Sequence, residues 1–241
     1  MSNMKLKDVV INYEEVGSGS FALVHCHGLG GDGSNFVEEL DFWNTFFGRV
    51  ITWDNRGLGK SSQAAKYSMP LYAADLSDLL DKLGVEKAVL HGVSWGGLVV
   101  QQFALDYQEK CAALILDSTS SEVNISASEN WYQQSVDAPL GKGSRVVQPE
   151  HMDSFVTQAR AIASTREHPF TPRLKEIKCP VLVVGGGQDV VAGAGGSVVL
   201  GRNLPNAHME IIQDSGHGVY RQKPEEFRKL VVNFLSKQGI I

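Results

Sequence analysis

The stretch "LHGVSWGG", residues 90–97, decides the fold. It contains the pattern Gly-x-Ser-x-Gly with Ser94 at its centre, and it joins an apolar run to a helical pattern. This setting matters because a sharp turn between a strand and a helix leaves no room for side chains beside the serine. Such a turn exposes the serine hydroxyl at the end of a sheet. We therefore expect Ser94 to be a nucleophile, with the backbone N–H of Trp95 directed toward the group that it attacks.

Short apolar runs alternate with helical patterns along most of the chain. The runs are apolar on both faces, which is typical of strands buried in a parallel sheet. They are "FALVHC" (21–26), "RVITWD" (49–54), "KAVLHGV" (87–93), "AALILD" (112–117), "PVLVVGG" (180–186) and "HMEIIQ" (208–213), after a first strand within residues 9–20. The helical patterns cover residues 71–84, 96–110 and 224–237, with Gly84 as a stop and Ser61 and Ser62 as candidate N-caps. This alternation predicts an α/β protein with a mostly parallel sheet.

The alternation breaks once, between residues 120 and 170. This segment mixes polar loops with one or two short helical patterns and contains no clear strand. We interpret it as a small cap insertion (120–170) within a single domain that spans residues 1–241. Most aromatic side chains of the cap are expected to hold it together. Trp131 and Phe155 are the candidates to line an apolar substrate pocket.

The composition argues against several classes of protein. The net charge is −5 and no basic stripe is visible, which argues against a nucleic-acid partner. No run approaches the roughly 18 apolar residues of a membrane span, and the N-terminus lacks the apolar core of a secretory signal. Three scattered cysteines are typical of free thiols in a reducing compartment. We therefore expect a cytoplasmic protein, either a monomer or a homodimer.

A serine nucleophile needs a base and an acid that orients the base. Asp189 follows an apolar run in a glycine-rich loop, and His217 follows the last run between two glycines. Both stand where a strand ends, and open α/β sheets place their sites at the carboxyl ends of strands. A helix N-cap is the structural alternative for Asp189, and an ordinary loop residue is the alternative for His217. Asp117 also ends an apolar run and is the other candidate acid.

The chain resembles the α/β-hydrolase superfamily over nearly its whole length. The resemblance implies an eight-stranded, mostly parallel sheet with helices on both faces, Ser94 as nucleophile, Asp189 as acid and His217 as base. It is greatest for small carboxylesterases, 3-oxoadipate enol-lactonases and carbon–carbon bond hydrolases of ring-cleavage pathways. The cap is shorter than in many of these relatives, and residues 190–206 contain more glycine than the helix expected there. The matching elements, in the family's order, are "HGLGGDGSNF" (27–36), "DNRGLGKSS" (54–62), "GVSWGG" (92–97), "GGGQD" (185–189) and "SGHGVY" (215–220).

The stretch "GLGGDG", residues 28–33, has two interpretations. Its glycine spacing is that of a dinucleotide-binding turn, and Asp54 stands about where a ribose-binding acid belongs. In the family that the chain resembles, this turn helps to form an oxyanion hole, which implies the backbone N–H groups of Leu29 and Trp95 as donors. We favour the oxyanion hole, because the dinucleotide interpretation leaves the three triad candidates unexplained. Asp54 and Arg56 are then expected to brace the turn after the next strand.

The remaining histidines do not predict a metal site. His25 and His27 are two residues apart, but no third ligand stands nearby and no H-E-x-x-H pattern exists. His91 is expected to pack beside the serine turn. We expect no metal and no cofactor. The expected function is hydrolysis of a small-molecule ester or lactone through an acyl-enzyme, and the alternatives are a carbon–carbon bond hydrolase and a non-catalytic ligand-binding protein of the same fold.

Overall fold

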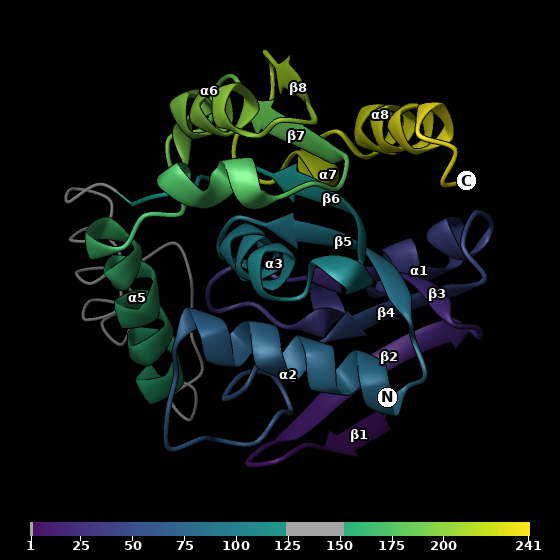
Figure 1. Ribbon diagram of the computed structural model, residues 1–241, viewed down its shortest axis with the longest axis vertical. Helices are drawn as coiled ribbons and strands as arrows, with labels where there is room; N and C mark the ends of the chain where they lie inside the picture. Colours follow the sequence, from purple (N-terminus) through teal and green to yellow (C-terminus); the bar gives the residue numbers. More distant parts are fainter. Residues whose placement is uncertain (1, 124–151) are drawn as a thin grey trace.

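The computed structural model describes residues 2–123 and 152–241 around an eight-stranded sheet (Figure 1). The strand order is β1-β2-β4-β3-β5-β6-β7-β8. The pairs β1–β2 and β2–β4 are antiparallel, and every other pair is parallel. The predicted α/β class and the mostly parallel eight-stranded sheet are therefore confirmed. The strands are β1 (Ser2–Lys5), β2 (Val10–Gly17), β3 (Phe21–Cys26), β4 (Arg49–Trp53), β5 (Lys87–Val93), β6 (Cys111–Asp117), β7 (Val181–Gly186) and β8 (Ala207–Ile212).

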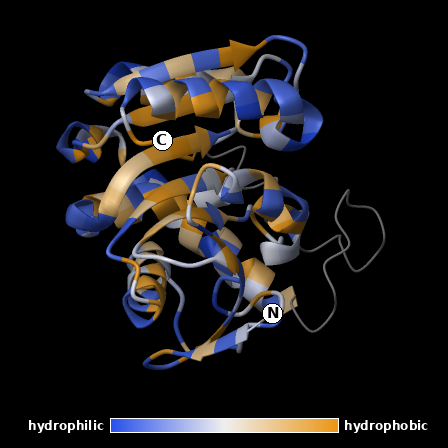
Figure 2. Ribbon diagram, turned by 90° about the vertical axis from the view of Figure 1, so that its right-hand side faces the viewer, coloured by the Kyte–Doolittle hydropathy of each residue, from blue (hydrophilic) through white to orange (hydrophobic). Residues whose placement is uncertain are grey.

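Helices cover both faces of this sheet, as predicted. Successive side chains of a strand point to opposite faces, so each buried strand contributes to two cores. In β5, Ala88 and Leu90 face one core and Val89 faces the other. Figure 2 shows hydrophobic residues concentrated in the central strands. The α-helices described are α1 (Val37–Asn44), α2 (Met69–Lys82), α3 (Trp95–Asp106), α5 (Met152–Glu167), α6 (Gly193–Asn203), α7 (Val219–Gln222) and α8 (Pro224–Lys237), with 3-10 turns η1 (Gly33–Phe36), η2 (Gln108–Lys110) and η5 (Thr171–Glu176).

The start of α2 corrects one expectation from the sequence. The side chain of Ser68 caps this helix, and Gly84 with a φ of +68° follows its end. Ser61 and Ser62 do not cap a helix. Their hydroxyls instead accept hydrogen bonds of 2.9 Å from backbone N–H groups of β2. The two serines therefore attach the loop after β4 to the sheet.

The described part of the predicted cap comprises residues 120–123, the helix α5 and residues 168–170. Its side chains Phe155 and Ile162 are buried in the same core as α2 and α3. The hydroxyl of Ser154 donates a 2.6 Å hydrogen bond to the side chain of Gln63, which anchors the helix to the main body. Residues 124–151, and with them Trp131, lie outside the described residues, so the cap boundaries stay a prediction. Within the described ranges, no helix is long and apolar enough to cross a lipid bilayer.

Candidate active site

Ser94 lies on a strained turn between β5 and α3. Its backbone has φ 55° and ψ −118°, a region that side-chain-bearing residues rarely adopt. Hydrogen bonds on both sides hold this conformation. The N–H of Ser94 donates to the carbonyl of Asp117 at 2.9 Å, and the hydroxyl of Thr119 donates to the carbonyl of Ser94 at 2.6 Å. The predicted sharp turn is therefore present, and neighbouring strand β6 supports it.

The glycines around the serine permit close contacts between backbone segments. A side chain on Gly92 would collide with the backbone of Gly96, because β5 and α3 meet there. A side chain on Gly96 would collide with the carbonyl oxygens of Cys26 and His27 at the end of β3. The pattern Gly-x-Ser-x-Gly is thus a packing requirement of the junction between β3, β5 and α3.

His217 and Asp189 form the hydrogen-bonded pair expected of a base and its acid. The distance from Nδ1 of His217 to Oδ2 of Asp189 is 2.9 Å. The other carboxylate oxygen of Asp189 accepts backbone N–H bonds from Val191 at 2.7 Å and Ala192 at 3.0 Å. Asp189 therefore stabilises its own loop and contacts His217 at the same time. It does not cap α6, whose N-cap residue is Ala192 and has no side-chain cap hydrogen bond, so the helix-cap alternative is wrong.

These contacts keep the carboxylate ionised. Burial would raise the pKa of Asp189, but the hydrogen bond and charge of His217 and the two backbone N–H groups hold the pKa below its usual range. An ionised acid at this position fixes the tautomer of the imidazole and favours its protonated form. The pair is thus suited to take a proton from a neighbouring hydroxyl.

Asp117, the other candidate acid, contacts the same loop but not the imidazole. Its carboxylate accepts backbone N–H bonds of 3.0 Å from Val219 and Tyr220 at the start of α7, and a 2.8 Å bond from the hydroxyl of Ser118. Burial raises the pKa of Asp117, and these three hydrogen bonds limit the rise. Asp117 therefore holds the segment that follows His217 in place.

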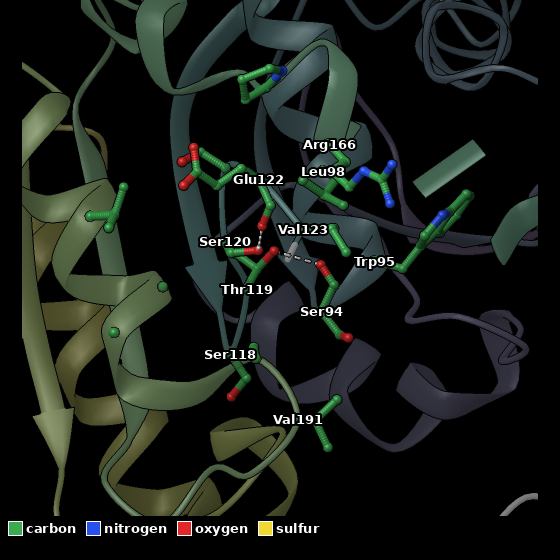
Figure 3. A pocket seen from close by; sticks show the side chains of 16 residues that line it. Ser94, Trp95, Leu98, Ser118, Thr119, Ser120, Glu122, Val123, Arg166 and Val191 are labelled. Atoms are coloured by element: carbon green, nitrogen blue, oxygen red, sulfur yellow. Dashed lines mark hydrogen bonds between the residues drawn. The ribbon is translucent and has the colours of Figure 1, made fainter. Parts of the chain in front are cut away.

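Two pockets meet at Ser94. The smaller has a volume of about 230 Å³ and contains Ser94 and His217 with Gly28 and Gly218 in its wall. The larger, of about 390 Å³, lies between α3, α5 and α6 and is drawn in Figure 3. Ser94 lines both pockets.

The turn at residues 28–33 passes beside the nucleophile. A methyl group placed on Gly28 would lie 3.5 Å from Cβ of Ser94. His27 fixes this turn, because its Nε2 accepts the N–H of Asn55 at 3.1 Å and its Nδ1 lies 2.8 Å from the carbonyl of Gly28. The turn therefore has the position that an oxyanion hole needs. The roles of the Leu29 and Trp95 N–H groups as donors stay a prediction.

The dinucleotide interpretation of this turn does not fit the structure. The carboxylate of Asp54 is occupied by the chain's own donors, namely the N–H of Gly33 at 2.7 Å, the side chain of Asn12 at 2.8 Å and the N–H of Lys60 at 2.8 Å. Asp54 thus braces two loops, as expected. Arg56 likewise bonds to Asp75 at 2.6 Å.

Comparison with known proteins agrees with this geometry. A family model described as "alpha/beta hydrolase fold" matches residues 22–142. The chain belongs to this family. A curated relative, 2-hydroxy-6-oxo-6-phenylhexa-2,4-dienoate hydrolase of Comamonas testosteroni, is 25% identical over an alignment that covers 99% of this chain and 95% of the relative.

Solved structures of other α/β hydrolases have the same fold. A thermophilic esterase from Thermogutta terrifontis superposes with a TM-score of 0.84 at 24% identity, covering 98% of this chain and 99% of that one. The enol-lactonase from Burkholderia xenovorans LB400 superposes with a TM-score of 0.82 at 21% identity, covering 95% and 97%. These two matches show that the fold is shared.

The two strand histidines of this α/β hydrolase form a buried pair. The Nδ1 atoms of His25 and His91 are 2.8 Å apart, and the ring of His25 stacks on Phe36 at 4.8 Å. Burial lowers the pKa of His25 to about 3, and burial and the neighbouring His25 lower that of His91 as well. Both imidazoles are therefore neutral, with one donating to the other. Among the described residues no three possible ligands gather around a metal position.

This pair makes stability sensitive to acid. In the unfolded chain His25 takes up a proton near pH 6.5, whereas in the folded chain it does so only at about pH 3. Between these two pH values the unfolded state binds more protons than the folded state, so a falling pH favours unfolding. We expect the contribution of His25 to the free energy of unfolding to be complete above pH 6.5. It should fall by about 2 kcal/mol between pH 7 and about pH 5. Urea unfolding at a series of pH values measures this dependence. The His25→Asn variant, which keeps a hydrogen-bonding group near Nδ1, should have a flatter profile. Equal profiles would contradict the prediction.

Of the two cap residues proposed for substrate binding, only Phe155 lies within the described residues. Phe155 is only 4% exposed and packs in the core, and it is not among the described residues that line either pocket. Its role in substrate binding stays a prediction. The wall of the larger pocket instead includes Arg166 of α5 and Gly195 and Gly196 of α6, which sequence reasoning missed. The only signal was the unusual glycine content of residues 190–206.

Proposed function

We propose that this α/β hydrolase cleaves a small carboxylic ester or lactone through an acyl-enzyme intermediate. One observation carries the proposal. The backbone of Ser94 has φ 55°, and the residue lines both pockets. It shares the smaller pocket with His217, whose Nδ1 is hydrogen-bonded to Asp189. A strained, supported serine beside an oriented imidazole is the arrangement that activates a hydroxyl for acyl transfer.

The proposed reaction uses these groups in two half-reactions. The imidazole of His217 takes the proton of Ser94 as the hydroxyl attacks the carbonyl carbon, and it then gives this proton to the leaving group. The N–H groups of Leu29 and Trp95 hold the oxyanion, each contributing roughly 3 kcal/mol. Asp189 stabilises the imidazolium. A water activated by His217 then releases the acyl group, so the proposed reaction requires no cofactor and no metal.

A second candidate is hydrolysis of a carbon–carbon bond by the same residues. The name of the Comamonas relative, a hydrolase of a ring-cleavage dienoate, supports this candidate. In that case His217 would protonate a carbon leaving group instead of an oxygen. A ligand-binding protein without turnover is the third possibility that the sequence raised.

Substrates tested side by side separate these candidates. The purified protein is incubated with short p-nitrophenyl esters, small lactones and a ring-fission dienoate, with the Ser94→Ala variant as the blank. We expect kcat/KM to be highest for an ester or lactone. A dienoate cleaved faster than every ester would favour the second candidate. Binding without turnover of any substrate would favour the third.

We also infer that the enzyme works in the cytoplasm as a monomer or homodimer. The described cysteines support a reducing compartment, because Cys26, Cys111 and Cys179 are all free thiols. The sulfur atoms of Cys111 and Cys179 are 3.7 Å apart and not bonded to each other. Small esters and lactones, rather than nucleic acids or membranes, are the proposed partners.

A further inference from the structure

The larger pocket contains a cation that the proposed mechanism does not use. Arg166, near the end of α5, lines this pocket together with Leu98 and Ser94 (Figure 3). Within residues 2–123 and 152–241, Arg166 forms no ion pair. The pocket wall also contains the carboxylate of Glu122, but this group accepts a 2.7 Å hydrogen bond from the hydroxyl of Thr171. Among the described residues, therefore, no acidic side chain is paired with the guanidinium of Arg166, although the Glu122 carboxylate keeps its charge in the same pocket wall.

Part of the wall of this pocket suits an extended aliphatic chain, and another part carries the hydroxyl residues Ser118, Thr119, Ser120 and Ser121. Aliphatic side chains and two glycines supply much of its wall between Ser94 and the outer end of α5, and its volume is about 390 Å³. Gly196 is required for the close packing of α6 on the loop that follows β6, since a side chain there would lie 2.9 Å from Cβ of Ser120. The aliphatic and glycine residues are Leu98, Val123, Val191, Gly195, Gly196 and Val199.

The position of His217 decides which part of a substrate enters this pocket. The imidazole must deliver a proton to the leaving group, so the leaving group has to lie on its side of the nucleophile. His217 lines the smaller pocket and not the larger one. The leaving group therefore belongs in the smaller pocket of about 230 Å³, and the acyl group extends from Ser94 into the larger pocket.

We propose that Arg166 recognises a carboxylate at the far end of the acyl group. This inference rests on the proposed function and narrows its substrate class to esters or lactones whose acyl part is an aliphatic chain ending in an anion. A guanidinium matches a carboxylate with two parallel hydrogen bonds, whereas a lysine at the same position supplies charge without that geometry.

A pair of ethyl esters tests this assignment. Monoethyl adipate carries the terminal carboxylate, and ethyl hexanoate has a methyl group in its place. For the wild type we expect a higher kcat/KM with monoethyl adipate. In Arg166→Gln the ratio of the two kcat/KM values should fall about ten-fold, through KM, and Arg166→Lys should restore part of it. An unchanged ratio in Arg166→Gln would overturn the inference.

Two controls make the result specific. Arg160→Gln removes the same charge from the same helix at an exposed position outside the pocket, and it should leave the ratio unchanged. The acetate ester of hydroxyhexanoate places the carboxylate on the leaving group instead. Its KM should not depend on Arg166, and a ten-fold dependence would reverse the assignment of the two pockets.

A binding measurement separates this inference from the proposed function. Calorimetric titration of the Ser94→Ala protein with monoethyl adipate needs no turnover. If the wild type hydrolyses neither ester, the proposed function fails, and the titration still tests Arg166. About ten-fold weaker binding in the Ser94→Ala, Arg166→Gln double variant supports carboxylate recognition. Equal affinity in both proteins overturns it.

Discussion

We expect the Ser94→Ala variant to hydrolyse the best ester substrate roughly 10⁴-fold or more slowly than the wild type. Alanine removes the hydroxyl that attacks the carbonyl, while the imidazole of His217 and the oxyanion donors remain. The residual rate would come from binding and electrostatic stabilisation alone. Steady-state kcat with each protein, together with its circular dichroism spectrum, measures the effect on a folded enzyme. A loss of less than about ten-fold would exclude Ser94 as the nucleophile.

Covalent labelling tests the same residue without a substrate. Intact mass after exposure to a fluorophosphonate should show one adduct on the wild type and none on Ser94→Ala. Ser120→Ala is a matched control, because Ser120 lines the larger pocket but its hydroxyl bonds to the carbonyl of Glu122. This variant should label like the wild type. A folded wild type without an adduct would favour the ligand-binding alternative.

The sheet was predictable because most of its strands are buried on both faces. The strand Val181–Gly186 is buried at every position, and its sequence is apolar throughout because helices cover both of its faces. The first strand, Ser2–Lys5, was missed because its residues are mostly exposed and only its pairing with β2 defines it. Because the side chains of this strand bury no face, its sequence shows no alternation of apolar and polar residues.

The catalytic candidates were predictable because they depend on local turns. Ser94 and Asp189 follow the buried strands β5 and β7, and His217 follows the edge strand β8. Parallel strands bring their carboxyl ends to one edge of the sheet. The pocket wall depends instead on contacts between distant segments. Residues 193–203 contain enough glycine to weaken an isolated helix, yet α6 forms there because Gly196 and Gly201 allow it to pack on Ser120 and Met209. The hydrophobic periodicity of the sequence does not predict such contacts between distant segments.

Replacing each candidate acid by asparagine should change a different property of the enzyme. We expect Asp189→Asn to lower kcat and Asp117→Asn to lower the free energy of unfolding. In Asp189→Asn, the oxygen that accepts the Val191 and Ala192 N–H groups can be kept, but the amide NH₂ faces Nδ1 of His217. The imidazole then has to accept at Nδ1 and carry its proton at Nε2, so it cannot take the proton of Ser94. We expect kcat to fall roughly 10⁴-fold, as for the equivalent change in serine proteases, with little loss of stability.

In Asp117→Asn the loss should appear in stability. Both carboxylate oxygens of Asp117 accept backbone N–H groups of α7, so an amide NH₂ at either position opposes a buried donor. We expect the free energy of unfolding to fall by about 1–3 kcal/mol. Activity of the folded fraction should fall far less than in Asp189→Asn, because Asp117 acts on His217 only through the segment that follows it. Urea unfolding curves of both variants, together with kcat measured under conditions in which each variant is folded, test this contrast. If Asp117→Asn lost more kcat than Asp189→Asn while staying folded, the acid would have been assigned to the wrong strand.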